Sequence, residues 1–149
     1  VPGLDGSGKM GKSEGNAIYL ADSPKEIEKK VKRALTDAGP TEPNSVKPDY
    51  IENLFTIMRV VSTPDVVQHY ENKWNSCEIR YGDMKKQLAE DIIKVTSPIR
   101  ERILEIEKND AYLRKVTQEG AEKARESASK TITAVREIVG LRSFNAKDT

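Results

Sequence analysis

Glycine and proline are concentrated at the front of this sequence, and their distribution limits what it can fold into. Eleven of the sixteen glycine and proline residues lie in the first 48 positions, and the other 101 positions hold only five. Both residues interrupt helices, glycine through its conformational entropy and proline through its missing N–H. The pattern therefore predicts an irregular front segment followed by long helices. Because the sequence begins with a valine inside this loop-like run, we expect it to be a piece of a longer chain.

Capping residues and apolar spacing predict the first helices. Ser23-Pro24-Lys25-Glu26 combines a capping serine, a proline at the first helical position and a glutamate three residues after the cap. Apolar residues then follow at helical spacing, which predicts a helix over 24–35. The segment 36–49 is rich in proline and glycine and predicts a connecting loop. A second helix is expected over 51–58, and Thr63 is expected to cap a short third helix that ends at a turn over 74–76.

The rear of the sequence carries longer apolar stripes. Seven residues step by three or four positions, namely Met84, Leu88, Ile92, Val95, Ile99, Ile103 and Ile106. This spacing predicts one long helix with a kink near Pro98. Asp110 is expected to cap the next element, whose Leu113 and Val116 face inward, and a last stripe runs to Gly140. Together these elements predict an all-α fold, a helical bundle behind an irregular loop.

Composition excludes several classes of protein. Twenty-five Lys and Arg against 24 Asp and Glu leave a formal charge of +1, which excludes a strongly basic nucleic-acid arm. The sequence shows neither an apolar run long enough for a membrane nor a signal peptide, so we expect no membrane partner and a cytoplasmic location. Cys77 and His69 are the only residues of their types, so we expect no disulfide and no metal ligands.

The front loop is the segment whose residues indicate chemistry. Positions 6–13 contain three glycines, two lysines and two serines. Glycines let backbone N–H groups approach a phosphate closely, and each lysine supplies a compact positive charge with three donors. This combination predicts a site for a polyphosphate ligand.

Two motifs compete for these residues. The string from Gly6 to Ser13 satisfies G-x-x-x-x-G-K-[ST], the pattern of P-loop NTPases. That motif requires a buried strand before it and a helix directly after it, and the flanking residues predict neither. The alternative is Lys9-Met10-Gly11-Lys12-Ser13, which resembles the KMSKS signature of class I aminoacyl-tRNA synthetases, with glycine in place of the first serine.

The residues behind this signature resemble bacterial tryptophanyl-tRNA synthetases in the same order. Lys29–Asp37 is similar to that family's basic helix ending in Thr-Asp, and Tyr81–Glu90 with Pro98–Arg102 is similar to its long C-terminal helix. Glu119–Ala124 is similar to its last helix. The resemblance implies that residues 1–22 are the KMSKS loop and a connector from the catalytic domain, and that 23–149 form the helical C-terminal domain that binds the tRNA anticodon.

The resemblance also implies an activity. The family joins tryptophan to tRNA(Trp) in two steps through tryptophanyl-adenylate, using ATP with Mg²⁺ as the substrate complex. It implies that Lys9 and Lys12 are catalytic and stabilise the triphosphate and the departing pyrophosphate. Met10 would lie near the adenine, Ser13 would hydrogen-bond within the loop or to phosphate, and Gly11 would complete the ATP-binding set without the usual serine hydroxyl.

The resemblance also says what this segment lacks. The family's other ATP signature, HIGH, and its tryptophan pocket belong to another part of the enzyme, and His69-Tyr70-Glu71 is no substitute. We therefore expect the 149 residues to be a monomer without activity alone, and the intact enzyme to be a homodimer. Two alternatives from other classes stay open, a P-loop NTPase and a free-standing helical RNA-binding module.

Overall fold

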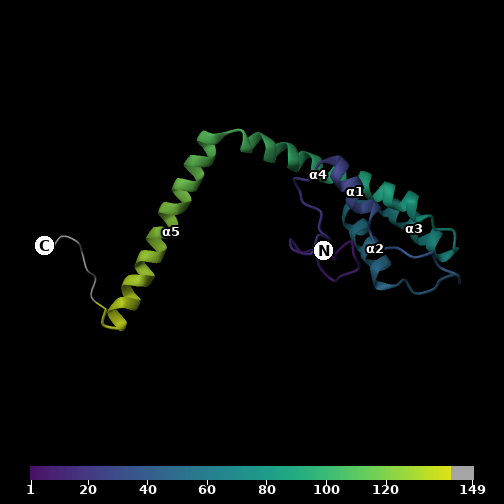
Figure 1. Ribbon diagram of the computed structural model, residues 1–149, viewed down its shortest axis with the longest axis horizontal. Coiled ribbons are helices and arrows are strands. Elements are labelled where there is room, and N and C mark those ends of the chain that lie inside the picture. The colour runs from purple at the N-terminus through teal and green to yellow at the C-terminus, as the bar shows by residue number, and fades with distance from the viewer. Residues whose placement is uncertain (142–149) are drawn as a thin grey trace. The chain divides into compact units, whose positions relative to one another are not determined.

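The computed structural model describes residues 1–141, and within them it contains five helices and no strand. The helices are α1 (Pro24–Lys32), α2 (Asp49–Val61), α3 (Pro64–Asn75), α4 (Tyr81–Glu107) and α5 (Asp110–Ile138), as Figure 1 shows. The prediction of an all-α fold is thus confirmed. The chain divides into two compact units, Val1–Ile103 and a second that begins at Leu104. None of the described helices is both long and apolar enough to cross a membrane.

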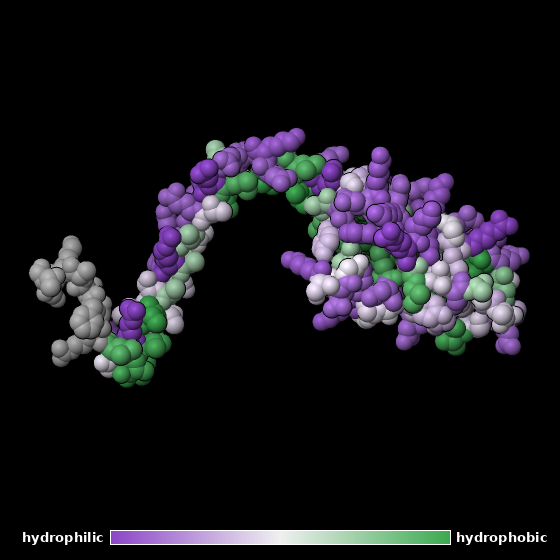
Figure 2. All heavy atoms as spheres, in the orientation of Figure 1, coloured by the Kyte–Doolittle hydropathy of each residue, from purple (hydrophilic) through white to green (hydrophobic). Residues whose placement is uncertain are grey.

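The first unit has a continuous apolar core. Its fully buried large side chains come from the first four helices and are Trp74, Phe55, Ile27, Ile51, Leu54, Met58, Met84, Leu88 and Val31. The front loop adds the buried Leu4 and the partly buried Met10 and Ile18 to this core. The irregular front segment is therefore packed onto the helices, and the face of the unit seen in Figure 2 is mostly hydrophilic.

Helix α1 begins where the capping motif predicts and ends earlier than expected. The Ser23 side chain accepts from the Glu26 N–H, and the Glu26 carboxylate accepts from the Ser23 N–H, which completes a capping box. The helix ends at Lys32 rather than at 35. The backbone N–H of Leu35 donates to the Leu4 carbonyl (2.9 Å), so the chain leaves the helix to bond the front segment.

Polar contacts fix the segment that follows α1. Asp37 accepts from the hydroxyls of Tyr81 (2.7 Å) and Tyr50 (2.9 Å). Burial raises the pKa of Tyr81, and its bond to the Asp37 carboxylate raises it further. Lys85 donates to the Ala34 carbonyl (2.8 Å) and to the Thr36 hydroxyl (2.9 Å), both just beyond the end of α1. These bonds tie the loop after α1 to α2 and α4.

Helix α3 is longer than the expected short helix, and the turn predicted over 74–76 comes later. Trp74 lies in the last turn of α3, and its side chain is 2% exposed. Its indole Nε1 donates to the Ser45 carbonyl (2.8 Å). The chain turns at Ser76 and Cys77 instead, where Cys77 has a positive φ of 58°. Burial of the indole in the core explains why the helix continues through Trp74.

Helix α4 buries only the first half of its predicted stripe. Met84, Leu88 and Ile92 are buried, whereas Val95 and Ile99 are exposed. Pro98 lies inside the helix without ending it. The helix begins in the first unit, and its last turn belongs to the second.

Helix α5 has no buried residue over its 29 positions. Asn109, not Asp110, is its N-cap, because the Asn109 side chain accepts from the Tyr112 N–H (3.0 Å). Leu113 and Val116, expected to face inward, are partly buried and exposed respectively. Ile132, Val135 and Ile138 of α5 and its C-cap Val139 are exposed as well. Figure 2 shows hydrophobic surface at the end of this helix.

Candidate functional site

The candidate site is the front loop, and the helices of the first unit hold it in place. Three hydrogen bonds fix its course: Leu35 N–H to the Leu4 carbonyl, Met10 N–H to the Val1 carbonyl (3.0 Å), and the Asn53 side chain on α2 to the Ser7 carbonyl (3.0 Å). Since the Leu4 side chain is also buried in the core, the loop is docked against the end of α1 and against α2.

Asn16 organises the interior of the loop. Its Nδ2 lies within hydrogen-bond distance of Ser7 Oγ (2.7 Å), Asp5 Oδ1 (3.0 Å) and the Lys9 carbonyl (3.1 Å), and its Oδ1 accepts from the Gly11 N–H (2.9 Å). The side chain is 4% exposed. No motif in the sequence points to this residue. Its partners lie five to eleven positions earlier, so no local spacing distinguishes it from an ordinary turn asparagine.

Asp5 accepts most of the remaining bonds in this cluster. The Ser7 hydroxyl (2.6 Å) and the Ser7 N–H (3.0 Å) both donate to Asp5 Oδ1. These two bonds from Ser7, with the bond from Asn16, lower the pKa of Asp5 to about 2. Asp5 is therefore a carboxylate at neutral pH, and it can only accept hydrogen bonds.

Gly3 closes the cluster from the other side. A Cβ at this position would lie 2.4 Å from both Asn16 Nδ2 and Ser7 Oγ, and 2.5 Å from Asp5 Oδ1. No side chain fits there without moving the cluster. The glycine thus lets the backbone of residue 3 pack directly on the side chains of Asp5, Ser7 and Asn16.

The structure places the five predicted ATP-binding residues in two adjoining stretches. Lys9, Met10 and Gly11 lie around the Asn16 amide, and Lys12 and Ser13 begin the turn that follows. Lys9, Lys12 and Ser13 are exposed, while Met10 packs against the core. Within residues 1–141, no hydrogen bond or ion pair engages the ammonium groups of Lys9 and Lys12. Their charges are available to an anion.

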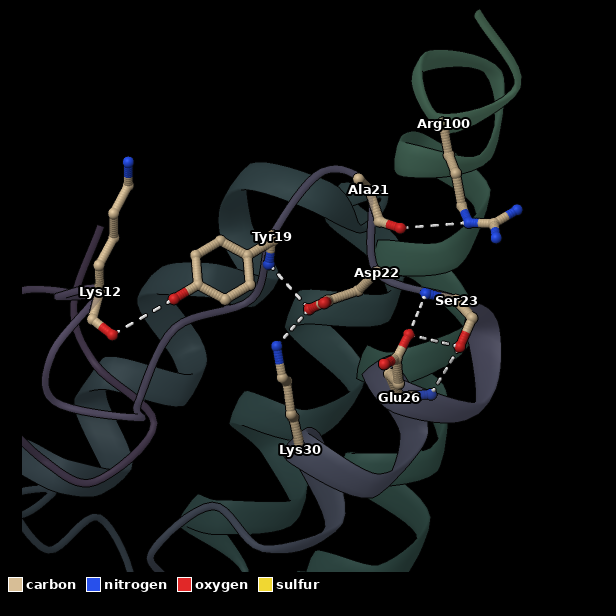
Figure 3. Close-up of polar contacts among 8 residues, drawn as sticks. All are labelled: Lys12, Tyr19, Ala21, Asp22, Ser23, Glu26, Lys30 and Arg100. Atoms are coloured by element: carbon tan, nitrogen blue, oxygen red, sulfur yellow. Dashed lines mark hydrogen bonds and ion pairs between the residues drawn. The ribbon is translucent and has the colours of Figure 1, made fainter. Parts of the chain in front are cut away.

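A short connector links the turn at Lys12 to α1 and α4 (Figure 3). The Lys12 carbonyl accepts from the Tyr19 hydroxyl (3.4 Å), and the Tyr19 N–H donates to Asp22 (2.8 Å). Asp22 in turn pairs with Lys30 of α1, while Arg100 of α4 donates to the Ala21 carbonyl (3.2 Å). In Figure 3 the Lys12 side chain points away from Tyr19, so the contact holds its backbone and leaves the ammonium group exposed.

A hollow of about 380 Å³ lies between this loop and α1. Acidic and basic side chains line it in equal number: Asp5, Glu14, Glu26, Lys29, Lys30 and Arg33. Lys9 and Lys12 are not among its lining residues. The mixed charge gives this hollow no preference for an anion, so the exposed lysines remain the better phosphate ligands.

The surroundings of the loop do not fit the P-loop alternative. In the part of the chain that the structure describes, no strand precedes Gly6, and the helix after Ser13 begins only at Pro24. A P-loop needs a helix N-terminus directly behind the glycines to face the phosphates. The match of residues 6–13 to that motif is therefore accidental. Residues 1–141 also contain no group of three or more His, Cys, Asp or Glu placed to hold a metal ion.

The amino-acid sequence is similar to those of known aminoacyl-tRNA synthetases. A family model described as tRNA synthetases class I (W and Y) matches residues 1–97. A tryptophan–tRNA ligase of Porphyromonas gingivalis is 63% identical over 95% of this chain, and one of Clostridium longisporum is 38% identical over 97%. The chain spans 43% of the length of each of these relatives.

A solved structure is similar as well. The tryptophanyl-tRNA synthetase of Campylobacter jejuni, complexed with ADP and tryptophan, matches with a TM-score of 0.72 and 26% identity. The match covers 95% of this chain and 43% of that protein.

Proposed function

Because the chain belongs to the class I tRNA synthetase family of the W and Y type, we propose that it is part of a tryptophan–tRNA ligase. The observation that carries this proposal is the 63% identity to a tryptophan–tRNA ligase over 95% of the chain. Since the chain spans 43% of that relative, the activity is proposed for the full-length protein. A tryptophan rather than a tyrosine substrate is favoured because the similar curated proteins carry that name.

The reaction proceeds in two steps. A carboxylate oxygen of tryptophan attacks the α-phosphorus of ATP, the bond to the bridging oxygen breaks, and pyrophosphate leaves. A ribose hydroxyl at the 3′ end of tRNA(Trp) then attacks the carbonyl carbon of the adenylate, and AMP leaves. No protein side chain forms a covalent bond, so positioning and charge stabilisation lower the barrier.

The front loop supplies charge for the first step. Lys9 and Lys12 contact the triphosphate of the ATP–Mg²⁺ substrate and stabilise the negative charge that develops on pyrophosphate. Their exposure and lack of ion-pair partners within residues 1–141 support this role. Met10, Gly11 and Ser13 complete the ATP-binding set. Gly8 is exposed, and nothing lies within 4 Å of the place a Cβ would take there, so it leaves room for phosphate oxygens on the loop.

The helices serve the second step. Residues 23–149 form the domain that binds tRNA, and residues 1–22 belong with the catalytic machinery. The full-length enzyme is a cytoplasmic homodimer. The 149 residues alone form a monomer, and this monomer has no activity because it lacks a HIGH motif. The single histidine, His69, is exposed on α3 and takes no part in the site.

Amino-acid-dependent exchange of pyrophosphate into ATP tests the proposal in the full-length protein. We expect exchange that requires tryptophan and does not occur with tyrosine. Exchange that requires tyrosine would overturn the tryptophan assignment within the same family. ATP hydrolysis without any amino acid would favour an NTPase. Binding of tRNA without exchange would favour the RNA-binding module.

A further inference from the structure

The Asn16 side chain holds the two residues on either side of Met10. Its Nδ2 donates to the Lys9 carbonyl (3.1 Å), and its Oδ1 accepts from the Gly11 N–H (2.9 Å). A side-chain amide used in this way replaces a neighbouring peptide group, which would donate and accept in the same manner. Asn16 thus fixes the backbone at Lys9 and Gly11 in the way that a neighbouring strand fixes a strand of a sheet.

The partners of Asn16 permit only one orientation of its amide. Asp5 Oδ1, Ser7 Oγ and the Lys9 carbonyl gather around Nδ2, and a carboxylate and a carbonyl can only accept. The Ser7 hydroxyl donates to Asp5 (2.6 Å), so it too presents a lone pair to Asn16. Rotating the amide by 180° would place its oxygen against these acceptors and its nitrogen against the Gly11 N–H. The acceptors on one side and the donor on the other fix the amide.

Burial strengthens this arrangement. Asn16 is 4% exposed, and the backbone of Gly3 packs on the cluster so closely that a Cβ would lie 2.4 Å from Nδ2. Water is thus kept from the amide, and a buried polar group that loses its partners costs more than an exposed one. The loop therefore has a defined resting shape, although the side chains of Lys9 and Lys12 are in solvent.

Resting on the function proposed above, we propose that Asn16 is a positioning residue that fixes the backbone of Lys9 and Gly11 so that the lysine meets the phosphates of ATP during adenylate formation. Asn16 touches no substrate and acts through Lys9. Misplacing a catalytic group by about 1 Å can reduce a rate by about 10²-fold. Removing the hold of Asn16 on the loop leaves both lysine charges in place and changes only where they lie.

The main test replaces Asn16 by aspartate in the full-length protein. Asn16→Asp keeps the size and one acceptor for Gly11, but it loses both N–H donors and faces Asp5 with a second carboxylate. We expect single-turnover adenylate formation to slow by about 10²-fold. Tryptophan affinity should stay near that of the parent, and the variant should still melt cooperatively, at a temperature lowered by the loss of the buried bonds. Asn72→Asp, the same change on the exposed surface of α3, serves as the control and should leave the rate unchanged.

A double-variant cycle distinguishes positioning from a general structural role. If Asn16 acts through Lys9, then Asn16→Asp should slow a Lys9→Ala enzyme by much less than it slows the parent. Rate losses that simply multiply would overturn the proposal. So would a folded Asn16→Asp enzyme with the parental rate, or one that loses rate and tryptophan affinity together.

Two further measurements keep the test decisive. If Asn16→Asp fails to fold, Ser7→Ala replaces it in the test. This variant keeps Asn16 and removes the hydroxyl that bonds both Asn16 and Asp5, so it should slow adenylate formation by less than about 10²-fold, and a parental rate would overturn the proposal. Deuterium exchange at the Gly11 amide should accelerate in Asn16→Ala, which removes the oxygen that accepts from this amide, independently of any activity. An unchanged Gly11 amide would overturn the role of Asn16, whereas a parent that forms no tryptophanyl-adenylate would overturn the proposed function instead.

Discussion

The first unit and helix α5 carry similar apolar stripes, yet they use them differently. In the first unit, stripe residues such as Met84 and Leu88 are fully buried. In α5 no residue is buried, and apolar residues such as Ile132 and Val135 are exposed. Spacing of three and four identifies which face of a helix is apolar, but it does not show that anything within the same chain covers that face.

The two regions also differ in what holds them together. The front loop depends on contacts between distant residues, such as Asn53 with the Ser7 carbonyl and Leu35 with the Leu4 carbonyl. Side-chain ion pairs within α5 join residues one turn apart, as in Arg114 with Asp110 and Lys130 with Glu126. Such exposed pairs contribute about 0.3–0.5 kcal/mol each. The first unit is therefore sensitive to single substitutions, and α5 is tolerant of them.

The largest expected difference between the regions is catalytic. In the full-length protein, Lys12→Ala should slow adenylate formation by about 10²–10³-fold, because its charge is needed most as pyrophosphate departs. Tryptophan affinity should change little. The matched change on α5, Lys130→Ala, should leave the rate unaltered. Pre-steady-state adenylate formation measures both, and a Lys12→Ala enzyme with a normal rate and weak tryptophan binding would contradict the role assigned to Lys12.

The next difference concerns packing in the 149-residue chain. Leu88→Ala removes a side chain that is 0% exposed and should lower the free energy of unfolding by about 2–5 kcal/mol. Val135→Ala shortens a side chain at a residue that is 45% exposed, and it should change the free energy of unfolding by about 0.5 kcal/mol or less. Urea denaturation of both variants gives the two values. Equal losses would show that the face of α5 is buried in solution.

Glycine substitutions should have opposite signs in the two regions. Gly3→Ala places a methyl group against Asn16 and Ser7 and should destabilise the front loop. Gly120→Ala lies inside α5, where nothing lies within 4 Å of the new Cβ, and should stabilise that helix by about 0.5–1 kcal/mol. Circular dichroism during thermal unfolding should show the gain for Gly120→Ala. If both Gly3→Ala and Gly120→Ala destabilise the protein, then Gly120 lies in a packed contact in solution.

Acid should act on the loop through Asp5. Its pKa is about 2 in the folded loop, against an ordinary value of 3.8. Because the pKa is depressed, the stabilisation is present above about pH 4 and is lost as the pH falls from 3.8 through 2. Deuterium exchange at the Gly11 amide should therefore lose protection in this range. In an Asp5→Asn variant, protection of the Gly11 amide should no longer fall between pH 3.8 and 2. If protection still falls over this range in the variant, another titrating group causes the loss.

The smallest effect is expected at Gly11. A Cβ there would lie 2.7 Å from Glu14 Cγ, but Glu14 is exposed and its side chain can move away. Gly11→Ser should therefore fold normally and keep tryptophan activation within about a few-fold of the parent, since a glycine substitution that the backbone tolerates shifts stability by only about 1 kcal/mol. A collapse of nucleotide binding in a variant that still melts cooperatively would favour the P-loop interpretation.

Local signals predicted what local interactions determine. The start of α1 follows from Ser23 and Glu26, which lie three residues apart and bond each other. The end of α1 depends on Leu4, and the length of α3 depends on the bond between Trp74 and Ser45, so neither could be obtained from spacing. In the site, the lysines were identified by their chemistry. Asn16 was missed because its role exists only when the loop closes.

The position of Trp74 has an optical consequence. It is the only tryptophan in the sequence, and its indole is buried in the first unit with Nε1 bonded to the Ser45 carbonyl. Its fluorescence should therefore be blue-shifted in the native protein and should move to longer wavelength only when that core opens. Melting of α5 would leave the emission unaltered while reducing the helical signal in the far ultraviolet. One aromatic side chain thus separates the unfolding of the core from the fraying of a helix, without any label.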